Sequence, residues 1–397
     1  MAVSVATSTR FDRLVGQSHR LETPFLLIDL PRVRENLRRL REAFGGAEVF
    51  YAVKANPHPA VLRAVAEAGG GFEISSEGEL DLIAALGRAV PLISSNPIKS
   101  PGFIERSAHA GVEGLAIDSP DEIAKLARVA PGATVYVRLL VDNSGSEWPL
   151  ARKYGVSATE ATELLFQAAE HGLRPCGTTF HVGSQCRRAA SWDAALAVTA
   201  EVWNEAGRRG LNLDFLSIGG GFPVQHTRPI ASLDEIAEVV RRGIAERFPD
   251  RIRLTLEPGR ALVGDAALLG ASVIGKAQRG DERWVYLDVG VFNGLMEAIE
   301  GFSYEIVAER EGPAQRVVLA GPSCDSVDVI AESALLPELA VGERVHVANA
   351  GAYTLAYAAS FNGWPPPTVH LLDESESASQ SGGPSRSGAN ESRKEST

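Results

Sequence analysis

Eight short apolar segments, each followed by a more polar stretch, set the strongest limit on how this chain can fold. Helical patterns between them include residues 77–86, 189–208 and 233–247. Strands that alternate with helices form parallel sheets, and eight strands are the number that closes a barrel. The pattern therefore predicts a (β/α)8 barrel rather than an open doubly wound sheet. The eight segments are residues 49–56, 71–76, 91–97, 114–119, 134–141, 177–185, 215–223 and 253–260.

The alternation stops near residue 264, where strand-like segments begin to follow one another without helices. We expect the barrel to span residues 30–263 and a C-terminal β domain, a sandwich or small barrel, to span residues 264–372. The apolar segment 23–29 is predicted as a strand, and we expect residues 1–29 to join the β domain. The later segments with strand character are residues 284–289, 316–320, 343–347 and 368–372.

The last 25 residues, 373–397, are mostly Ser, Glu, Gly and Arg, with almost nothing apolar among them. Such a segment buries too little apolar surface to offset the entropy of ordering it. We expect this tail to be disordered.

The charge and the cysteines exclude several classes of protein. A net charge of −11 without basic stripes argues against nucleic acids and anionic membranes as partners. No apolar run is long enough to span a membrane, and no secretory signal opens the chain. Cys176, Cys186 and Cys324 are too few and too scattered for a disulfide framework or a zinc site. We expect a cytoplasmic protein without a metal.

Lys54 is out of place in the apolar segment that contains it. An unpaired ammonium is costly to bury, so such a lysine usually has a charged partner or a lowered pKa. A neutral amine at a strand end is a nucleophile suited to forming a Schiff base. The alternative is a lysine whose amine simply reaches solvent.

Unusual residues gather at the C-terminal ends of the predicted strands. In a barrel these ends meet at one face, where active sites are built. The segment from Asp142 to Tyr154 after the fifth strand is long for a barrel loop and is a candidate lid. The residues at the strand ends are Lys54, Glu73, Arg138, His181, Gly219, Gly220, Gly221, Glu257 and Arg260.

Three of these strand ends have features of a phosphate-bearing cofactor site. The glycines 219–221 allow backbone N–H groups to approach an anion, although a tight turn is an equal alternative. Arg260 offers charge to a phosphate, and Glu257 offers a carboxylate to a pyridine nitrogen; a plain Glu–Arg salt bridge is the alternative. A flat ring can stack on His181, although a lone histidine is more often structural, and Ser184 can donate to phosphate.

The C-terminal β domain contributes further candidates. Cys324 and Asp325 follow a Gly-Pro turn, and a thiol is a competent proton donor near neutral pH. A buried structural cysteine is the commoner alternative. Tyr353 offers a phenol to a phosphate.

Six segments in order resemble the fold-type III decarboxylases that use pyridoxal 5′-phosphate, the family of ornithine, lysine, arginine and diaminopimelate decarboxylases. The resemblance covers residues 22–370. It implies an alanine-racemase-like barrel with a C-terminal β domain, and a homodimer with two shared sites. The segments are Tyr-Ala-Val-Lys-Ala-Asn, His-Val-Gly-Ser-Gln, Gly-Gly-Gly-Phe-Pro, Glu-Pro-Gly-Arg, Gly-Pro-Ser-Cys-Asp and Gly-Ala-Tyr.

The resemblance also assigns roles to single residues. Lys54 matches the Schiff-base lysine, His181 the residue stacked on the ring, and Glu257 the partner of the pyridine nitrogen. Cys324 matches a proton donor that comes, with Asp325, from the other subunit. The phosphate cradle matches Ser184, Gly219–Gly221, Arg260 and Tyr353, and site-supporting roles match Glu73, Glu79 and Arg138.

The Gly-Pro-Ser-Cys-Asp segment is most similar to the ornithine/lysine branch, which implies a decarboxylase that gives a diamine for polyamine metabolism. The Tyr-Asp pair of that branch is missing. Either Glu297 or Glu300, together with Asp325 and Tyr353, could bind the distal amine of the substrate. The alternative is that the two glutamates lie on a solvated helix and have no such role. We also predict a Lys153–Asp328 salt bridge across the dimer.

Other activities stay open at this point. They are decarboxylation of diaminopimelate, decarboxylation of a free or carrier-tethered amino acid in secondary metabolism, racemisation, and a non-catalytic regulatory role. A racemase needs two opposed bases, and a regulator tends to lose cofactor contacts that this sequence retains.

Overall fold

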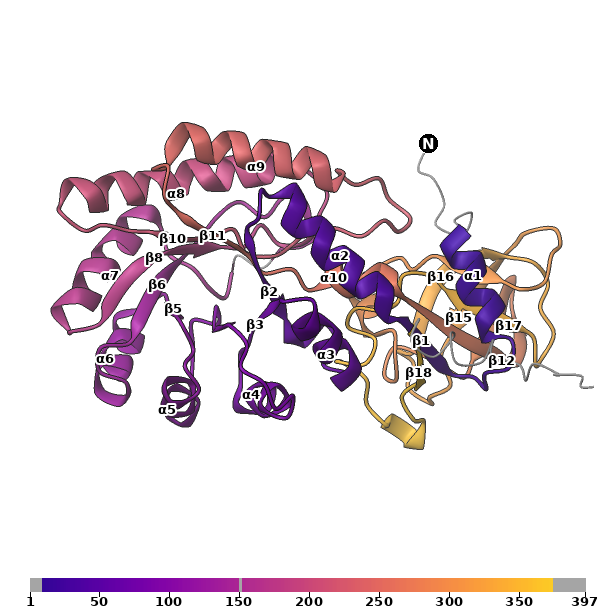
Figure 1. Ribbon diagram of the computed structural model, residues 1–397. Helices are drawn as coiled ribbons and strands as arrows, with labels where there is room; N and C mark the ends of the chain where they lie inside the picture. Colours follow the sequence, from indigo (N-terminus) through magenta and orange to yellow (C-terminus); the bar gives the residue numbers. More distant parts are fainter. Residues whose placement is uncertain (1–8, 150–151, 374–397) are drawn as a thin grey trace, which may run out of the picture.

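The computed structural model describes residues 9–149 and 152–373, so the tail expected to be disordered lies outside it from residue 374 on. Eight parallel strands form the first sheet, on the left in Figure 1. Each of the eight apolar segments contributes one of them, which confirms the predicted strands. They are β2 (Glu48–Ala52), β3 (Gly71–Glu73), β4 (Leu92–Ile93), β5 (Leu115–Ile117), β6 (Thr134–Leu139), β8 (Arg174–Phe180), β10 (Phe215–Ser217) and β11 (Arg253–Leu256).

The sheet closes into a barrel. Its strand order is β4-β3-β2-β11-β10-β8-β6-β5, and a parallel bridge between Ser94 and Leu115 joins the two end strands. Most strands end several residues earlier than predicted. β2, for example, ends at Ala52, and the 3-10 helix η2 (Val53–Ala55) follows it. The (β/α)8 fold class is confirmed, with turns rather than strand at the sites of the polar residues.

Helices cover the outside of the barrel (Figure 1). Several begin at a serine whose side chain accepts a hydrogen bond from a backbone N–H of the first turn, as Ser76 and Ser119 do. Ser157 and Ser232 form complete capping boxes with a glutamate three residues later. The helices are α2 (Leu30–Ala43), α3 (Pro59–Glu67), α4 (Glu77–Ala84), α5 (Pro101–His109), α6 (Pro120–Val129), α7 (Ala158–Glu170), α8 (Ala190–Arg208), α9 (Leu233–Arg247) and α10 (Arg260–Val263).

A second, mixed sheet forms the body on the right of Figure 1. The predicted N-terminal strand β1 (Phe25–Asp29) pairs antiparallel with β12 (Ala267–Arg279) and parallel with β18 (Thr368–Leu372), as expected. β12 was not predicted from the sequence, and neither were three shorter elements: the helix α1 (Thr9–Ser18), β14 (Ile306–Ala308) and β16 (Val329–Leu336). The remaining strands are β13 (Glu282–Leu287), β15 (Gln315–Ala320) and β17 (Arg344–Val347).

Asp265 joins the two bodies where the chain passes from one to the other. Its carboxylate accepts hydrogen bonds from Arg10 of α1 and from Arg32 and Asn36 of α2. Burial alone would raise the pKa of Asp265, but these partners outweigh it and lower the pKa. The 3-10 helix η3 (Gly264–Ala266) is thereby fixed against α2. The domain limits at residues 263 and 264 remain a prediction.

In the described ranges, 9–149 and 152–373, no helix combines the length and the apolar character needed to cross a membrane.

Candidate active site

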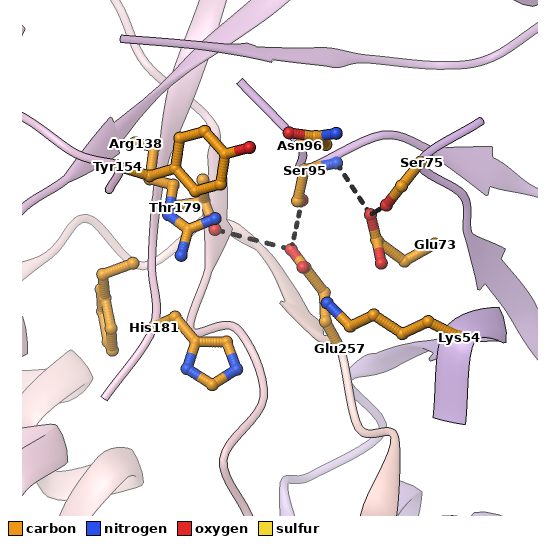
Figure 2. Close-up of a pocket in the computed structure, with 11 residues that line it drawn as sticks. Lys54, Glu73, Ser75, Ser95, Asn96, Arg138, Tyr154, Thr179, His181 and Glu257 are labelled. Atoms are coloured by element: carbon orange, nitrogen blue, oxygen red, sulfur yellow. Dashed lines mark hydrogen bonds between the residues drawn. The ribbon is translucent and has the colours of Figure 1, made fainter. Parts of the chain in front are cut away.

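A cavity of about 190 Å³ lies at the C-terminal end of the barrel strands. Figure 2 shows its walls, with Lys54 reaching toward Glu257, and Glu73, Arg138 and His181 around them. Five predicted site residues are therefore brought together at one face. The full lining is Lys54, Glu73, Ser75, Ser95, Asn96, Arg138, Tyr154, Thr179, Phe180, His181 and Glu257.

Lys54 projects from η2 directly after β2. The turn is held by two hydrogen bonds: Tyr51 Oη donates to the Asn56 carbonyl at 3.1 Å, and the Tyr353 N–H donates to the Ala55 carbonyl at 2.7 Å. Its side chain lines the cavity, which is open on one side, and this opening accounts for its exposed surface. The amine lies inside the site rather than out in bulk solvent.

The charge of Lys54 depends on its neighbours. Desolvation is the largest single influence and lowers the pKa of Lys54, but the charges of Glu73 and Tyr353 outweigh it, and the pKa is raised. Of the two states considered from the sequence, the lysine therefore has charged partners rather than a lowered pKa. Its amine is protonated until a bound group displaces or neutralises those charges.

Glu257 is held by hydroxyl groups from three parts of the barrel, namely the turn after β4 and the strands β8 and β10. Its Oε1 accepts hydrogen bonds from Ser95 Oγ at 2.7 Å, from Thr179 Oγ1 at 3.5 Å and from Ser217 Oγ. Burial and the charge of Glu73 raise the pKa of Glu257, while the bonds from Ser217 and Ser95 act in the opposite sense. Because all three donors go to Oε1, the carboxylate is fixed in one orientation. The Glu257–Arg260 salt bridge considered from the sequence does not form.

These hydroxyl donors were missed from the sequence. Ser95, Thr179 and Ser217 each lie at or just beyond a strand end, the position that identified the other candidates. Their position at strand ends was therefore the only feature of the sequence that could have identified them. Serine and threonine are too common at such positions for this feature to distinguish them.

Glu73 lies at the end of β3, fully buried. Its Oε1 accepts hydrogen bonds from the Ser95 N–H and from Ser75 Oγ, both at 3.2 Å. Glu79 stands behind it, where its Oε2 accepts from the Ser75 N–H at 2.6 Å. Burial, followed by the charge of Glu73, raises the pKa of Glu79 to about 7. The first acid thus faces the cavity and the second braces the turn that carries Ser75.

His181 and Arg138 face the cavity from β8 and β6. His181 Nδ1 accepts a hydrogen bond from the Gly183 N–H at 3.0 Å. Desolvation, then the charges of Arg138 and Lys54, hold the pKa of His181 well below its usual value. The imidazole is therefore in its neutral form. Arg138 lies over the ring of Tyr154, with 5.3 Å between the guanidinium carbon and the ring centre.

The loop of Gly219, Gly220 and Gly221 follows β10 and lies against both Glu257 and His181. A methyl group added at Gly220 would stand 2.6 Å from the Glu257 carbonyl oxygen and 3.2 Å from His181 Nε2. Gly219 and Gly221 have φ angles of +63° and +92°, which side chains rarely adopt. The loop thus brings bare backbone close to the cavity, as predicted for a turn or for an anion site.

Arg260 differs from its predicted role in one respect, because it already has a carboxylate partner. Arg260 Nη1 donates to Glu297 Oε2 at 3.0 Å and Nη2 donates to Glu297 Oε1, with both side chains buried. Glu297 was one of two candidates for binding a substrate amine. Both carboxylate oxygens of Glu297 are paired with Arg260, and a role for Glu297 in binding the substrate amine stays a prediction. Glu300 of the same 3-10 helix, η4 (Met296–Glu300), is exposed.

Other predicted cradle residues lie near this pair but outside the cavity lining. The Arg260 guanidinium carbon is 4.9 Å from the centre of the Tyr353 ring, and the phenol oxygen of Tyr353 lies close to Gly259. Ser184 begins β9 (Ser184–Cys186), which pairs with β7 (Ser146–Trp148). The candidate lid from Asp142 to Tyr154 therefore contains a paired strand, while residues 150 and 151 lie outside the described residues.

Cys324 and Asp325 are exposed and do not line the cavity of their own chain. The turn that carries them is braced by Asp328, whose buried carboxylate accepts from the Val291 N–H at 2.8 Å and the Ser323 N–H at 2.9 Å. The Asp328 carboxylate therefore has hydrogen-bond partners within its own chain. The ion pair expected between Lys153 and Asp328 of two chains stays a prediction.

Comparison with known proteins agrees with this geometry. The chain is 37% identical over 367 residues to the lysine/ornithine decarboxylase of Selenomonas ruminantium, covering 91% of this chain and 93% of that protein. The structure of a Vibrio vulnificus lysine/ornithine decarboxylase complexed with putrescine matches with a TM-score of 0.84 at 32% identity, over 92% of this chain and 99% of that one.

A structure described as SrLDC in complex with PLP and cadaverine also matches, with a TM-score of 0.84 at 34% identity, over 96% and 97% of the two chains. The family model for the pyridoxal binding domain of pyridoxal-dependent decarboxylases matches residues 30–264. That span holds the barrel, Lys54 and Glu257. The chain belongs to the family of pyridoxal-dependent decarboxylases.

Proposed function

We propose that this protein removes the α-carboxylate of lysine, ornithine or both, with pyridoxal 5′-phosphate as cofactor, and releases a diamine and carbon dioxide. The observation that carries the proposal is the single cavity in which Lys54, Glu257, His181 and Arg138 meet. Relatives named lysine/ornithine decarboxylase match over nearly the whole chain, and two matching structures contain putrescine and cadaverine. Those two diamines are the products expected from ornithine and lysine.

The residues around the cavity fit this cofactor. Arg260 Nε is buried and has no acceptor among the described residues, so one donor is left for an anion. The glycine loop leaves no room for side chains beside Glu257 and His181. We assign the phosphate to Ser184, Gly219–Gly221, Arg260 and Tyr353, a set of neutral and cationic donors suited to phosphate.

Five of the polar residues that line the cavity then have assigned roles. Pyridoxal phosphate, when bound, supplies a conjugated ring that takes up the electron pair released as the carboxylate leaves. Lys54 holds the cofactor through its amine, and Glu257 holds a proton on the pyridine nitrogen. His181 is neutral, so it can lie against a flat ring without adding charge. Glu73 and Arg138 set the charge around Lys54.

We propose that the substrate's distal ammonium is bound by Glu300 and by Asp325 of a second chain. Glu300 is exposed near the ion pair of Arg260 and Glu297, whereas Glu297 is fully engaged. Asp325 is exposed and separate from the cavity of its own chain. Exposed carboxylates stay hydrated and mobile, so they can bind and release the ammonium group of a substrate. Substrates with an acidic distal group are disfavoured by the same charges.

A homodimer with shared sites completes the proposal. Cys324 and Asp325 cannot serve the cavity of their own chain if they do not line it, and they are solvent-exposed in a single chain. Beside them lies a groove of about 860 Å³ that includes the exposed apolar side chains of Ile299, Val327 and Leu335. A second chain that covers this groove would bring its Cys324 to the site as proton donor. We place the enzyme in the cytoplasm.

The direct test is a carbon dioxide release screen with added pyridoxal phosphate. Lysine, ornithine, arginine, diaminopimelate and acidic amino acids are compared, and release from lysine or ornithine is expected to dominate. Borohydride reduction followed by peptide mapping should fix the cofactor to Lys54, and Lys54→Ala should abolish both signals. A colourless protein, or loss of optical rotation without carbon dioxide, would reject the proposal.

A further inference from the structure

Lys99 is a second lysine of the barrel whose side chain is wholly enclosed, with 0% of it exposed. It does not line the cavity and has no part in the chemistry described above. It follows β4 in the loop that leads to α5. An ammonium in such a place is costly to desolvate, and an apolar side chain of similar size is often at least as stabilising. Its presence therefore needs an explanation beyond stability.

The hydrogen bonds of Lys99 go to backbone carbonyl groups. Lys99 Nζ donates to the carbonyls of Asn96 at 3.0 Å, Pro97 at 3.1 Å and Ala116 at 2.6 Å. An ammonium has three donors, so these acceptors can use all of them. Glu122 supplies the opposite charge, with its Oε1 3.2 Å from Nζ, yet that oxygen accepts no hydrogen bond within the described part of the chain. Lys99 thus ties the loop 96–97 to β5.

The other side of the same loop forms part of the active site. Ser95 donates its N–H to Glu73 and its hydroxyl to Glu257. Asn96 lines the cavity next to it. The carbonyls of Asn96 and Pro97 thus accept hydrogen bonds from Lys99, while Ser95 donates hydrogen bonds to the carboxylates of Glu73 and Glu257. Any displacement of the loop changes both of those contacts together.

A backbone loop can be held in this way only by a group with several donors. If Lys99 were replaced by an apolar residue, the carbonyls of Asn96, Pro97 and Ala116 would lose their partner in a buried place. The loop could recover those bonds only by turning toward water. Such a turn would move Ser95 away from Glu257, the proposed partner of the pyridine nitrogen.

We propose that Lys99 is a positioning residue that sets the contact of Ser95 with Glu257 and Glu73, and through it the binding of the cofactor ring. The inference rests on the proposed function, because it concerns the same cofactor site. Lys99 touches neither the cavity nor a reacting atom, and it acts through the loop alone.

The test compares Lys99→Met with two controls on α6. Lys125 is paired with the same Glu122 and donates a hydrogen bond to the Lys99 carbonyl rather than to the carbonyls of Asn96 and Pro97, so Lys125→Met removes a charge and leaves the bonds that hold those two residues in place. Leu126 is fully buried on the same helix, so Leu126→Ala reproduces a loss of stability. The double variant Lys99→Met/Glu122→Leu removes the buried pair together and leaves no unpaired carboxylate.

Three quantities are measured: the dissociation constant of pyridoxal phosphate by equilibrium dialysis, the visible absorbance of the bound cofactor, and the melting temperature of the cofactor-free protein. We expect Lys99→Met to weaken cofactor binding by roughly tenfold or more, as loss of several buried hydrogen bonds at one loop predicts, and to change the absorbance band. Lys125→Met and Leu126→Ala should keep the band and stay within about threefold of the wild-type affinity, whatever their melting temperatures.

The double variant should regain stability without regaining affinity. If Lys99→Met is too unstable to study, the double variant tests the same contact. Wild-type cofactor affinity and absorbance in Lys99→Met or in the double variant would overturn the inference. An equal loss of cofactor affinity in Leu126→Ala would overturn it as well. Failure of the wild-type protein to bind pyridoxal phosphate at Lys54 would instead reject the proposed function.

Discussion

Arg260 and Glu297 form a two-point ion pair inside the protein, although they lie 37 positions apart in the sequence. Their side chains are only 5% and 8% exposed. The Arg260 guanidinium carbon also lies 5.0 Å from the centre of the Trp148 ring, 5.4 Å from that of Phe302 and 4.9 Å from that of Tyr353. An arginine proposed to bind phosphate is therefore held in place beforehand by one carboxylate and three aromatic rings.

Glu297→Gln should destabilise the cofactor-free protein by about 3 kcal/mol, because it removes one charge of a buried pair and leaves the other. The same change frees Arg260 to pair with phosphate alone. We therefore expect pyridoxal phosphate to raise the melting temperature of the variant more than that of the wild type. Thermal unfolding with and without the cofactor measures both effects. An unchanged cofactor-free melting temperature would contradict the first.

Glu300→Gln is the matched change on the same 3-10 helix and should behave in the opposite way. Glu300 is exposed, so stability should change by less than about 0.5 kcal/mol. If Glu300 binds the distal ammonium, KM for lysine or ornithine should rise by roughly tenfold, the loss of one charged hydrogen bond. Steady-state kinetics of the two variants separate the roles. If KM rises in neither variant, neither Glu297 nor Glu300 binds the substrate.

Ser95→Ala should impair the site through Glu257. The Ser95 hydroxyl donates to Glu257 and holds its pKa down against the effect of burial, so its loss should raise the pKa of Glu257. The acid limb of the activity profile should then move to higher pH. Ser94→Ala is a close control, because the buried Ser94 hydroxyl has no hydrogen-bond partner among the described residues. The pH dependence of kcat/KM is measured for both variants; a coincident pair of profiles would count against the role of Ser95.

Strand ends could be found from the sequence because buried parallel strands are short and apolar, and a charged residue interrupts them. Lys54, Glu73, Arg138, His181 and Glu257 were all identified in that way, and all line the cavity. Their roles toward the cofactor remain predictions.

Contacts between distant segments could not be found in the same way. The Arg260–Glu297 pair depends on how the second body packs on the barrel, and the ring of hydroxyls at Oε1 of Glu257 depends on strand order. The strand β12 (Ala267–Arg279) was missed for a related reason. It begins as a uniformly buried apolar run and ends exposed, so it lacks the alternation that marks a half-buried strand.

Glu79 should make stability depend on pH in the neutral range. Its pKa is about 7 in the folded protein, against an ordinary value of 4.5. Between these values the folded state holds a proton that the unfolded state has lost, so the free energy of unfolding falls as pH rises from about 5 to about 8. The loss is at most on the order of 3 kcal/mol.

Glu79→Gln should remove this slope, and denaturant unfolding of the cofactor-free protein at several pH values measures it. Glu77→Gln, on the same helix but paired with Arg106, should leave the slope in place. Parallel pH curves for wild type and Glu79→Gln would show that Glu79 does not titrate in this range.

Gly220→Ala tests how closely the backbone must approach the cofactor site. The new methyl group would stand 2.6 Å from the Glu257 carbonyl oxygen, so the loop or β11 has to move. Since the same methyl also lies 3.2 Å from His181 Nε2, we expect cofactor affinity to fall by at least roughly tenfold, the effect of a displaced binding group. Gly207→Ala is the control. Gly207 lies within α8 with nothing within 4 Å of an added methyl, and alanine there should stabilise the protein by about 0.5–1 kcal/mol. Equilibrium dialysis should therefore show weaker cofactor binding only in Gly220→Ala, and thermal unfolding should show a higher melting temperature only in Gly207→Ala. Equal cofactor affinity in both variants would mean that the glycine loop does not approach the cofactor.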